Sequence, residues 1–351
     1  MEASTASAPP VAEAPATPGP GPYAALEQFL QPIRRHLAAE ITELAINRPG
    51  EFWTESARGW ERHVDQDLTY EKLQYLATLC ANAAKQKFGR GDPLLSTALP
   101  SGERVQLVVP PATSAGCVSI TIRKPGATRL SMAQYRESGF FDHAMVEPLG
   151  LQDHQRQLKE LLARHALPEF FALAVASRQT IVVSGATGSG KTTFMKALAD
   201  LIDAGERLVT VEDTAELEIT QPNHVRLFYA KGGQGTSNVT AGALVEAAMR
   251  MKPDRVLLAE VRDESAYYFL EAANTGHPGS ITSVHANSES AAFGRLRMLA
   301  RKAPEAAGMA DAALNDLVAS TVDIVVQVGK VDGKRAITGI FYDPERRPSL
   351  G

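Results

Sequence analysis

Residues 185–192 read Gly185-Ala186-Thr187-Gly188-Ser189-Gly190-Lys191-Thr192, and this stretch decides the fold. It fits the pattern G-x-x-x-x-G-K-[ST] of a loop that wraps around the phosphates of a nucleotide. A short β-branched run at 180–184 precedes the loop, and good helix formers at 193–200 follow it. A strand–loop–helix order is the context in which such a loop binds phosphate. The sequence therefore predicts an α/β domain that binds a nucleoside triphosphate.

The residue types in this loop explain the predicted chemistry. Glycines allow successive backbone N–H groups to point inward, and the N-terminus of the following helix adds partial positive charge. We expect Lys191 to reach the β- and γ-phosphates and the Thr192 hydroxyl to bind Mg²⁺. A glycine-rich turn that binds nothing is the alternative, and Lys-Thr at the required place argues against it. The predicted nucleotide-binding residues are Gly185, Ala186, Thr187, Gly188, Ser189, Gly190, Lys191, Thr192 and Thr193.

The composition is that of an ordinary soluble protein of about two domains. The chain has 351 residues, of which 44% are apolar and 22% charged. Its net charge of −4 argues against a protein whose main task is to coat nucleic acid. No apolar run approaches the roughly 18 residues of a membrane-spanning helix, and no secretory signal is expected. Cys80 and Cys117 lie apart among apolar residues, which argues against a metal module and favours a reducing cytoplasm.

Shifts in composition divide the chain into four parts. Residues 1–22 are almost all Ala, Pro, Gly, Ser, Thr and Glu, and they are predicted to form a disordered tail. Residues 23–125 mix helical and strand patterns, which predicts a smaller α+β N-terminal domain. Residues 126–150 resemble a linker. From 151 to 351, helices alternate with short buried strands, as in an α/β nucleotide-binding domain.

Local patterns predict the elements of the first domain. One face of a predicted helix at 69–85 carries Leu73, Leu76, Ala77, Cys80 and Ala84. A second helix is predicted at 24–37, with Pro32 as an interruption. Strands are predicted at 40–47, 51–56, 94–99, 104–109 and 117–123.

Carboxylates follow two buried strands of the second domain. The run 208–211 leads to Glu212, Asp213 and Glu216, which could hold Mg²⁺ or form a solvated acidic loop. The run 255–259 ends in Glu260, and a glutamate there can orient and deprotonate an attacking water. Next along the chain, Arg262 and Asp263 are expected to form an ion pair.

Histidines flank the predicted strand 281–284. His277 precedes this strand and His285 follows it. A histidine at a strand end can sense the γ-phosphate by a hydrogen bond, although a lone histidine is more often a structural donor. The two histidines in this domain favour the sensor for His285.

Four blocks closely resemble the secretion ATPase superfamily, whose members power type II and type IV secretion and type IV pili. They are GATGSGKT (185–192), VTVEDTAEL (209–217), RMKPDRVLLAEVRDESA (250–266) and ANTGHPGSITSVHAN (273–287). In the first half, ELAINRPGEFW, LPSGERVQLVVPP and SITIRKP resemble the VirB-eleven type traffic ATPases of type IV secretion systems. The chain lacks the paired-cysteine module of type II secretion ATPases.

This resemblance implies a fold and an activity. The fold would be a RecA-like P-loop ATPase domain preceded by the smaller α+β domain. The activity would be ATP hydrolysis with Mg²⁺ by a homohexamer at the cytoplasmic face of the inner membrane, attached peripherally. Its partners would be inner-membrane channel components and other secretion ATPases, with no stable nucleic-acid binding.

The resemblance also implies roles for individual residues. Two departures are mild, because Ala259 and Asp263 stand where glycines are common. Neither change removes a reacting group. The implied catalytic residues are Lys191, Glu260, His285, Glu212, Glu216, Arg104 and Arg123, with Thr192 and Glu212 as Mg²⁺ ligands, directly or through water.

Three other functions stay open at this point. A motor of a type IV pilus or tight-adherence system would carry the same motifs. An ATP-binding scaffold or switch with little turnover is a different class, against which Glu260 and the two arginines argue. A DNA-pumping helicase is disfavoured by the acidic balance.

Overall fold

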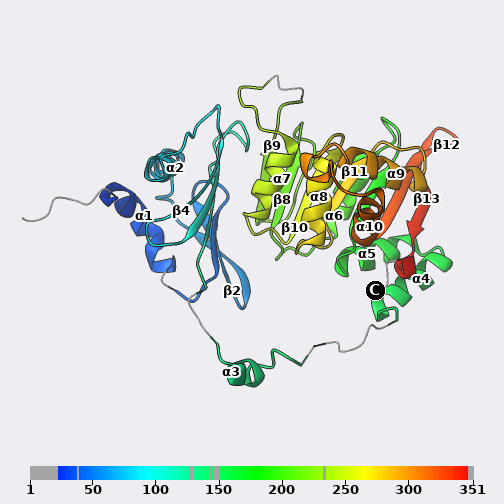
Figure 1. The fold of residues 1–351 in the computed structure, drawn as a ribbon, viewed down its shortest axis with the longest axis horizontal. Helices are drawn as coiled ribbons and strands as arrows, with labels where there is room; N and C mark the ends of the chain where they lie inside the picture. The colour runs from blue at the N-terminus through cyan, green and yellow to red at the C-terminus, as the bar shows by residue number, and fades with distance from the viewer. Residues whose placement is uncertain are drawn as a thin grey trace, which may run out of the picture.

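A computed structural model of the chain describes residues 23–37, 39–126, 130–142, 144, 150–231 and 235–346. The predicted tail, 1–22, and parts of the predicted linker lie outside these residues. Two β-sheets, each with its own helices, form two domains that lie side by side (Figure 1). The short helix α3 (Met132–Glu137) lies below both domains in this view. Within the described ranges, no helix is long and apolar enough to cross a membrane.

The first domain contains a six-stranded antiparallel sheet in the order β3-β2-β1-β6-β5-β4. Edge strand β3 was not predicted, because most of its residues are exposed and polar and give no apolar alternation. The strands are β1 (Glu43–Ile46), β2 (Glu51–Ser56), β3 (Gly59–Val64), β4 (Leu94–Ala98), β5 (Arg104–Val108) and β6 (Ser119–Arg123).

Helices α1 (Ala24–Leu37) and α2 (Tyr70–Ala84) cover the sheet face that is turned away from the second domain (Figure 1). The Thr69 hydroxyl caps α2 by accepting from the Lys72 amide, and Lys85 ends it in the left-handed region at φ 53°. The prediction that Pro32 interrupts the first helix was wrong, since α1 is continuous. Four of its apolar side chains are buried, each worth about 1.5–3 kcal/mol, which outweighs the roughly 3 kcal/mol cost of an internal proline.

The second domain contains a seven-stranded sheet in the order β13-β12-β7-β11-β10-β8-β9, parallel except for β13. The strands are β7 (Ile181–Ser184), β8 (Leu208–Glu212), β9 (His224–Phe228), β10 (Arg255–Val261), β11 (Ile281–Val284), β12 (Ile324–Val331) and β13 (Lys334–Tyr342). The helices are α4 (Asp153–Ala163), α5 (Leu167–Ala176), α6 (Lys191–Asp200), α7 (Ala241–Met249), α8 (Ser265–Asn274), α9 (Glu289–Ala300) and α10 (Asp311–Thr321), with short 3₁₀ turns η2 (Pro304–Ala306) and η3 (Pro344–Arg346).

Helices pack on both faces of this sheet because its central strands are apolar on both faces. On β7, Val182 joins the core beneath α7–α10, whereas Ile181 and Val183 join the core beneath α4–α6. Side chains alternate between faces along a strand, so each face presents a continuous apolar surface. The carboxyl ends of the parallel strands meet at one edge, where the site lies.

Strand β10 contains a bulge directly before its carboxyl end. Leu258 pairs with Thr282 of β11, but Val261 pairs with Val284, so β10 has one residue more than its neighbour in this interval. Consequently Val261 packs in the same core as Leu258, although simple alternation would place it on the opposite face. The bulge thereby frees the preceding residue, Glu260, from the core, as bulges near active sites often do.

A fully buried arginine joins the two domains. Arg207, at the start of β8, donates through Nη1 to the side-chain oxygens of Asn47 (2.7 Å) and Asn223 (2.6 Å). Its Nε donates to the backbone oxygen of Met251, and burial lowers its pKa to about 10. Asn47 belongs to the first domain, so one guanidinium ties both domains together.

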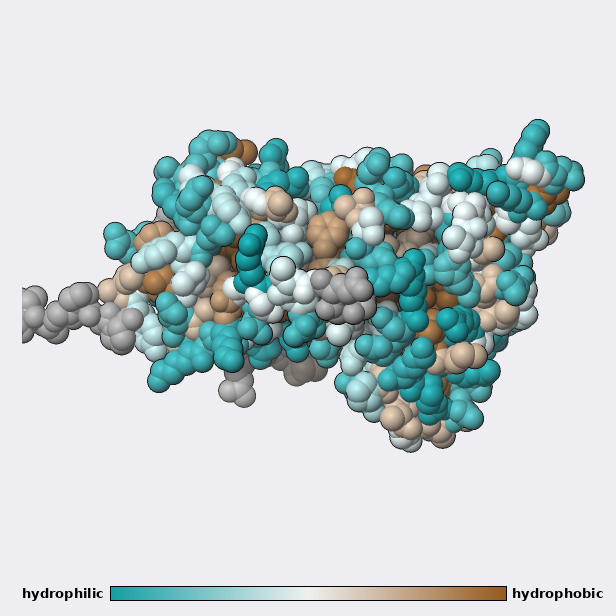
Figure 2. Space-filling view, turned by 90° about the horizontal axis from the view of Figure 1, so that it is seen from above, coloured by the Kyte–Doolittle hydropathy of each residue, from teal (hydrophilic) through white to brown (hydrophobic). Residues whose placement is uncertain are grey.

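Two further contacts lie beside this arginine. Lys252 Nζ donates to Glu55 of β2 at 2.8 Å. The segment that contains Thr113 pairs with β9, because Thr113 Oγ1 donates to the Arg226 oxygen and Phe228 N donates to the Ala112 oxygen. The contact between the domains also has an apolar part, since Val108 and Ala112 share a buried cluster with residues of β8 and β9. Seen from above, both domains present a mostly hydrophilic surface with scattered apolar residues (Figure 2).

Glu43 is buried at this contact and should make stability depend on pH. Burial raises its pKa from 4.5 to about 7, and Arg123, whose Nε lies 3.4 Å from it, only partly offsets the effect. The folded chain therefore holds a proton that the unfolded chain has released, so the free energy of unfolding falls as pH rises between 4.5 and about 7.

A Glu43→Gln variant is therefore expected to be more stable than wild type above neutral pH, by about 3 kcal/mol at full ionisation. At about pH 5 the two proteins should differ little, since most of the Glu43 carboxyl is then protonated when folded. Urea unfolding at both pH values measures the difference, with Glu61→Gln on exposed β3 as the matched control. An equal difference at both pH values would contradict the assignment.

Candidate nucleotide-binding and hydrolysis site

The loop between β7 and α6 has the geometry of a phosphate cradle. Gly188 and Gly190 have φ values of +72° and +103°, which favour glycine. A Cβ on Gly185 would lie 2.3 Å from the backbone oxygen of Val328, so no side chain fits there. Gly190 is the N-cap of α6 and offers no side chain to the first N–H groups of the helix, which stay available for an anion.

Two buried polar groups of the loop fit a bound phosphate. Ser189 is 4% exposed, and its hydroxyl has no hydrogen-bond partner among the described residues. Lys191 Nζ donates to the backbone oxygens of Gly185 (3.0 Å) and Ala186 (3.2 Å). Burial lowers the pKa of Lys191. The negative charge of Glu260 acts to raise this pKa, and the positive charge of Arg262 lowers it further. A phosphate oxygen would give this ammonium a better partner than two carbonyls.

Three predicted residues lie in one chain of contacts. His285 follows β11, and its Nδ1 lies 3.2 Å from Lys191 Nζ and 3.1 Å from the Gly185 oxygen. Its Nε2 lies 3.0 Å from Glu260 Oε1. A ring that carries its proton on Nε2 donates to Glu260 and accepts from Lys191, and its Nδ1 then makes no hydrogen bond to the Gly185 oxygen. The structure thus connects the phosphate loop, the histidine and the glutamate.

Arg262 and Asp213 extend this chain, and sequence reasoning missed the connection. Arg262 Nε and Nη2 donate to the two oxygens of Glu260 at 2.6 and 2.8 Å, while its Nη1 donates to Asp213 at 2.6 Å. The predicted Arg262–Asp263 pair was wrong, since Asp263 instead accepts from the Ser265 amide at the start of α8. The signal was present in part, because acidic residues lie near the carboxyl ends of both β8 and β10. Only the strand order shows that these two strands are neighbours.

These contacts set the acidity of Glu260. Its burial acts to raise the pKa, but the hydrogen bonds and charge of Arg262, with smaller effects of His285 and Lys191, lower it overall. The carboxylate is therefore ionised over a wide pH range. An ionised carboxylate next to a phosphate site can accept a proton from water.

The two predicted Asp-box carboxylates lie in different environments. Glu212 is fully buried and accepts five hydrogen bonds, from the Thr210 hydroxyl, the amides of Glu216 and Leu217, and two nitrogens of Arg226. These bonds shape the loop that follows β8. Glu216 is exposed on that loop. Their roles in catalysis and Mg²⁺ binding stay predictions.

The structure does not bring Arg104 and Arg123 to the phosphate loop within one chain. The two residues pair across β5 and β6, and their exposed side chains line a cavity of about 760 Å³ together with Lys252. Lys252 precedes β10, so this cavity lies at the amino-terminal edge of the second sheet. Lys191 follows β7 and lies at the opposite edge. Their contact with nucleotide stays a prediction.

A cavity of about 610 Å³ adjoins the phosphate loop and is large enough for a nucleotide. The loop and His285 form one side of it. Helix α9 forms the other side with Arg295, Arg297 and Met298, residues that the sequence did not single out. Their spacing gave no signal, since arginines on a helix are usually solvated.

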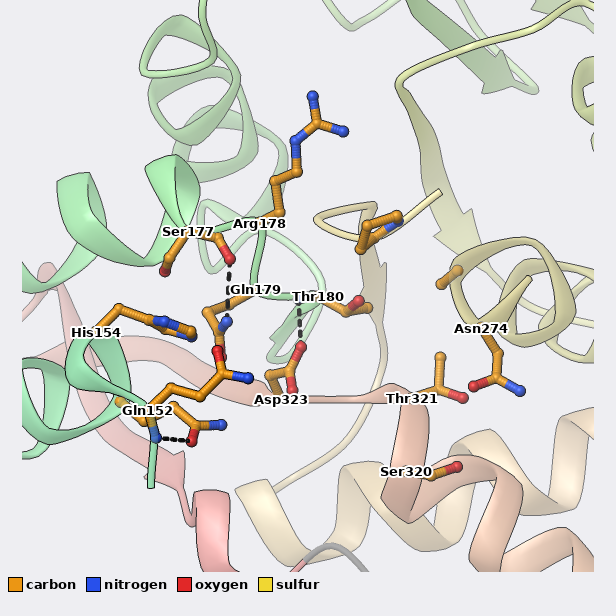
Figure 3. Close-up of a pocket in the computed structure, with 13 residues that line it drawn as sticks. Gln152, His154, Ser177, Arg178, Gln179, Thr180, Asn274, Ser320, Thr321 and Asp323 are labelled. Atoms are coloured by element: carbon orange, nitrogen blue, oxygen red, sulfur yellow. Dashed lines mark hydrogen bonds between the residues drawn. The ribbon is translucent and has the colours of Figure 1, made fainter. Parts of the chain in front are cut away.

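A second cavity, of about 350 Å³, lies at the amino-terminal edge and is a poor candidate (Figure 3). Asp323 Oδ2 accepts from the Thr180 amide at 2.8 Å, and the Arg178 side chain points away from the other labelled residues. Arg178 instead pairs with Glu206 at 3.3 Å. The cavity offers neither a glycine-rich loop nor a free cation for phosphate.

Comparisons with known proteins identify the family of the chain. Residues 27–330 match the family described as "Type II/IV secretion system protein". The chain is 38% identical over 333 residues to the type IV secretion system protein VirB11 of Bartonella quintana (92% of this chain, 94% of the relative). It is 40% identical over 334 residues to VirB11 of Brucella suis (93% and 92%).

The crystal structure of the Brucella suis VirB11 ATPase, in complex with sulphate, superposes with a TM-score of 0.87 at 40% identity, covering 92% of this chain and 99% of that one. This agreement confirms the predicted fold, a RecA-like P-loop ATPase domain preceded by a smaller α+β domain. The resemblance to VirB-eleven type proteins is likewise confirmed. The chain belongs to the family of type II/IV secretion system proteins.

Proposed function

We propose that this chain is an ATP-hydrolysing motor of a bacterial type IV secretion system and that it works as a homohexamer. The observation that supports hydrolysis is the chain of contacts from Lys191 through His285 to Glu260, beside the phosphate loop. A passive nucleotide-binding scaffold has no need for an ionised glutamate at this position. The VirB11 relatives are described as type IV secretion system proteins, which supports the assignment to such a system over a pilus or tight-adherence motor.

In the proposed reaction, Glu260 orients a water molecule and accepts its proton as the oxygen attacks the γ-phosphorus. The bond from the γ-phosphorus to the β–γ bridging oxygen breaks, which gives ADP and inorganic phosphate. Lys191 stabilises the charge on the phosphate oxygens, and His285 donates from Nε2 and holds Glu260 beside the loop. Mg²⁺, when held by Thr192, would neutralise part of that charge, whereas the buried Glu212 already accepts five hydrogen bonds and has no open position for a metal-bound water.

We further propose that Arg104 and Arg123 act on a nucleotide bound by a neighbouring copy in the ring. Both side chains are exposed at the edge opposite their own phosphate loop, which suits contact between copies. A guanidinium fork matches phosphate oxygens better than an ammonium does. The motor would be cytoplasmic and peripheral at the inner membrane, with channel components and other secretion ATPases as partners.

Phosphate release by the purified chain with ATP and Mg²⁺, together with its mass by light scattering, tests the proposal. We expect steady turnover and a hexamer at micromolar protein concentration. A monomer under these conditions contradicts the ring. ATP binding without turnover favours the scaffold or switch.

Arg104→Ala and Arg123→Ala are each expected to lower turnover at least about tenfold, with ring formation preserved, because each removes a charge that acts mainly in the transition state. Mixing Arg104→Ala with Lys191→Ala should restore part of the activity, since some interfaces then combine an intact arginine with an intact loop. Arg58→Ala, on the exposed β2–β3 turn, is the control. Full turnover by either single variant would contradict the role.

A further inference from the structure

The strongest unassigned feature is the arginine that connects Glu260 with Asp213. Arg262 directly follows β10, and Asp213 directly follows the adjacent strand β8. Three nitrogens of Arg262 donate hydrogen bonds of 2.6 to 2.8 Å. Two of these bonds go to the oxygens of Glu260, and one goes to Asp213. A guanidinium is planar and presents its donors in a fixed fork, so these contacts fix the direction of the Glu260 carboxylate.

The burial of this group makes the contact more than a surface ion pair. The side chains of Glu260, Asp213 and Arg262 are 13%, 19% and 35% exposed. Exposed ion pairs contribute little to the stability of a fold. A half-buried bidentate pair that is also bound to a second carboxylate, here Asp213, holds a defined geometry. A lysine at this position would have one nitrogen and could not bridge both carboxylates in the same way.

Each oxygen of Glu260 can accept about two hydrogen bonds. Oε1 accepts from Arg262 Nε and from His285 Nε2, so both of its positions are taken. Oε2 accepts only from Arg262 Nη2 among the described contacts, which leaves one position for a water. Arg262 therefore fixes the direction of the carboxylate, and the contact of His285 with Oε1 leaves Oε2 as the oxygen that can meet the attacking water.

We infer that Arg262 is a positioning residue for hydrolysis: it ties the carboxylate of Glu260 to Asp213 and leaves one oxygen open for the attacking water. The inference rests on the proposed ATP hydrolysis and adds a residue to that site. A misplacement of about 1 Å in a catalytic group can cost about 10²-fold in rate, so the tie has a large expected effect. Binding of ATP does not depend on it, because Arg262 is not part of the phosphate loop.

Arg262 also lowers the pKa of Glu260, the group that limits activity at low pH. The ionisable groups around Glu260 are Arg262 after β10, His285 after β11, Lys191 on α6, and Asp213 after β8, with Tyr229 after β9 beside Asp213. The charge and hydrogen bonds of Arg262 hold the pKa of Glu260 down. Without them this pKa rises, so the base becomes protonated, and activity is lost, at a higher pH.

The test compares steady-state hydrolysis by wild type, Arg262→Gln and Arg262→Lys across the acid range. Both variants are expected to lose about 10- to 100-fold in kcat with little change in KM. In Arg262→Gln the acid limb of the kcat profile should move to higher pH. In Arg262→Lys it should move less, because the charge remains while the fork is lost. Asp213→Asn should lower kcat in the same direction by removing the anchor.

A matched control is Arg62→Lys on edge strand β3, where two guanidinium nitrogens contact Glu51 at 2.7 and 2.5 Å in the other domain. It should leave kcat and the acid limb unchanged, and affinity for a fluorescent ATP analogue should report that all variants are folded. Wild-type kcat in Arg262→Lys or in Asp213→Asn would overturn the inference alone. So would a reduced kcat in Arg262→Gln with an unmoved acid limb, which is the result of a merely structural role. A wild-type chain that releases no phosphate would overturn the proposed function, and this inference with it.

Discussion

Lys191→Ala is expected to abolish measurable hydrolysis and to weaken ATP binding. The ammonium is buried in the loop and contacts only two backbone oxygens and His285 among the described residues, so it is placed to receive phosphate charge. A hydrogen bond to a charged group contributes about 1.5–3 kcal/mol, which corresponds to roughly 10- to 100-fold in affinity. The loss in turnover should be larger, about 10²–10³-fold, because the charge grows in the transition state.

Titration with a fluorescent ATP analogue measures the affinity, and phosphate release measures the turnover. Lys196→Ala is the control on the same helix, since Lys196 pairs with Glu218 at the surface, 3.2 Å away. That variant should behave as wild type. Normal ATP affinity in Lys191→Ala would refute the phosphate-loop assignment.

Glu260→Gln is expected to keep ATP binding and to lower turnover by about 10²–10⁴-fold. The amide occupies the same space but cannot accept a proton from water. Part of the Arg262 fork would lose its acceptor, yet the phosphate loop would be intact. Glu260→Gln should therefore trap the bound nucleotide.

Single-turnover hydrolysis and nucleotide affinity distinguish these effects. Glu264→Gln is the control, because this carboxylate lies next to the start of α8 and outside the chain of contacts. Near-normal turnover by Glu260→Gln would place the base elsewhere, with Glu212 or Glu216 to be tested next. Of these two, Glu216 is the exposed one.

Much of the second domain could be predicted from sequence because its signals are local. The boundaries of β11 were predicted to the residue, and the loop at 185–192 lies between a strand and a helix as expected. Buried parallel strands give uninterrupted apolar runs, and glycines mark the loop. Strands β3, β9, β12 and β13 were not predicted. The exposed residues of β3 and β13 give weak periodicity, whereas β9 has apolar alternation and β12 begins with an apolar run that was not assigned to a strand.

The connections within the site could not be predicted, because they depend on which strands are neighbours. Asp213 and Arg262 are 49 positions apart in sequence and become partners only because β8 lies beside β10. Similarly, the sequence could not show that the Glu212 oxygens accept hydrogen bonds from Arg226 and from the loop amides. The position of Arg104 depends on how the two domains meet, which local patterns do not encode.

The bulge in β10 divides the strand into two parts whose side chains alternate between the sheet faces independently of each other. Before the bulge, core packing determines which side chains point to each face, so Leu258 can be substituted only together with the residues that it packs against. After the bulge the alternation is shifted by one residue. The orientation of Glu260 therefore does not depend on which apolar residues the first part of the strand buries. Deleting Ala259 would restore simple alternation, so Val261 would keep its place opposite Val284 while Glu260 would turn to the sheet face opposite Leu258. Core and catalytic end can therefore vary separately in this strand, as long as the chain keeps the same number of residues between them.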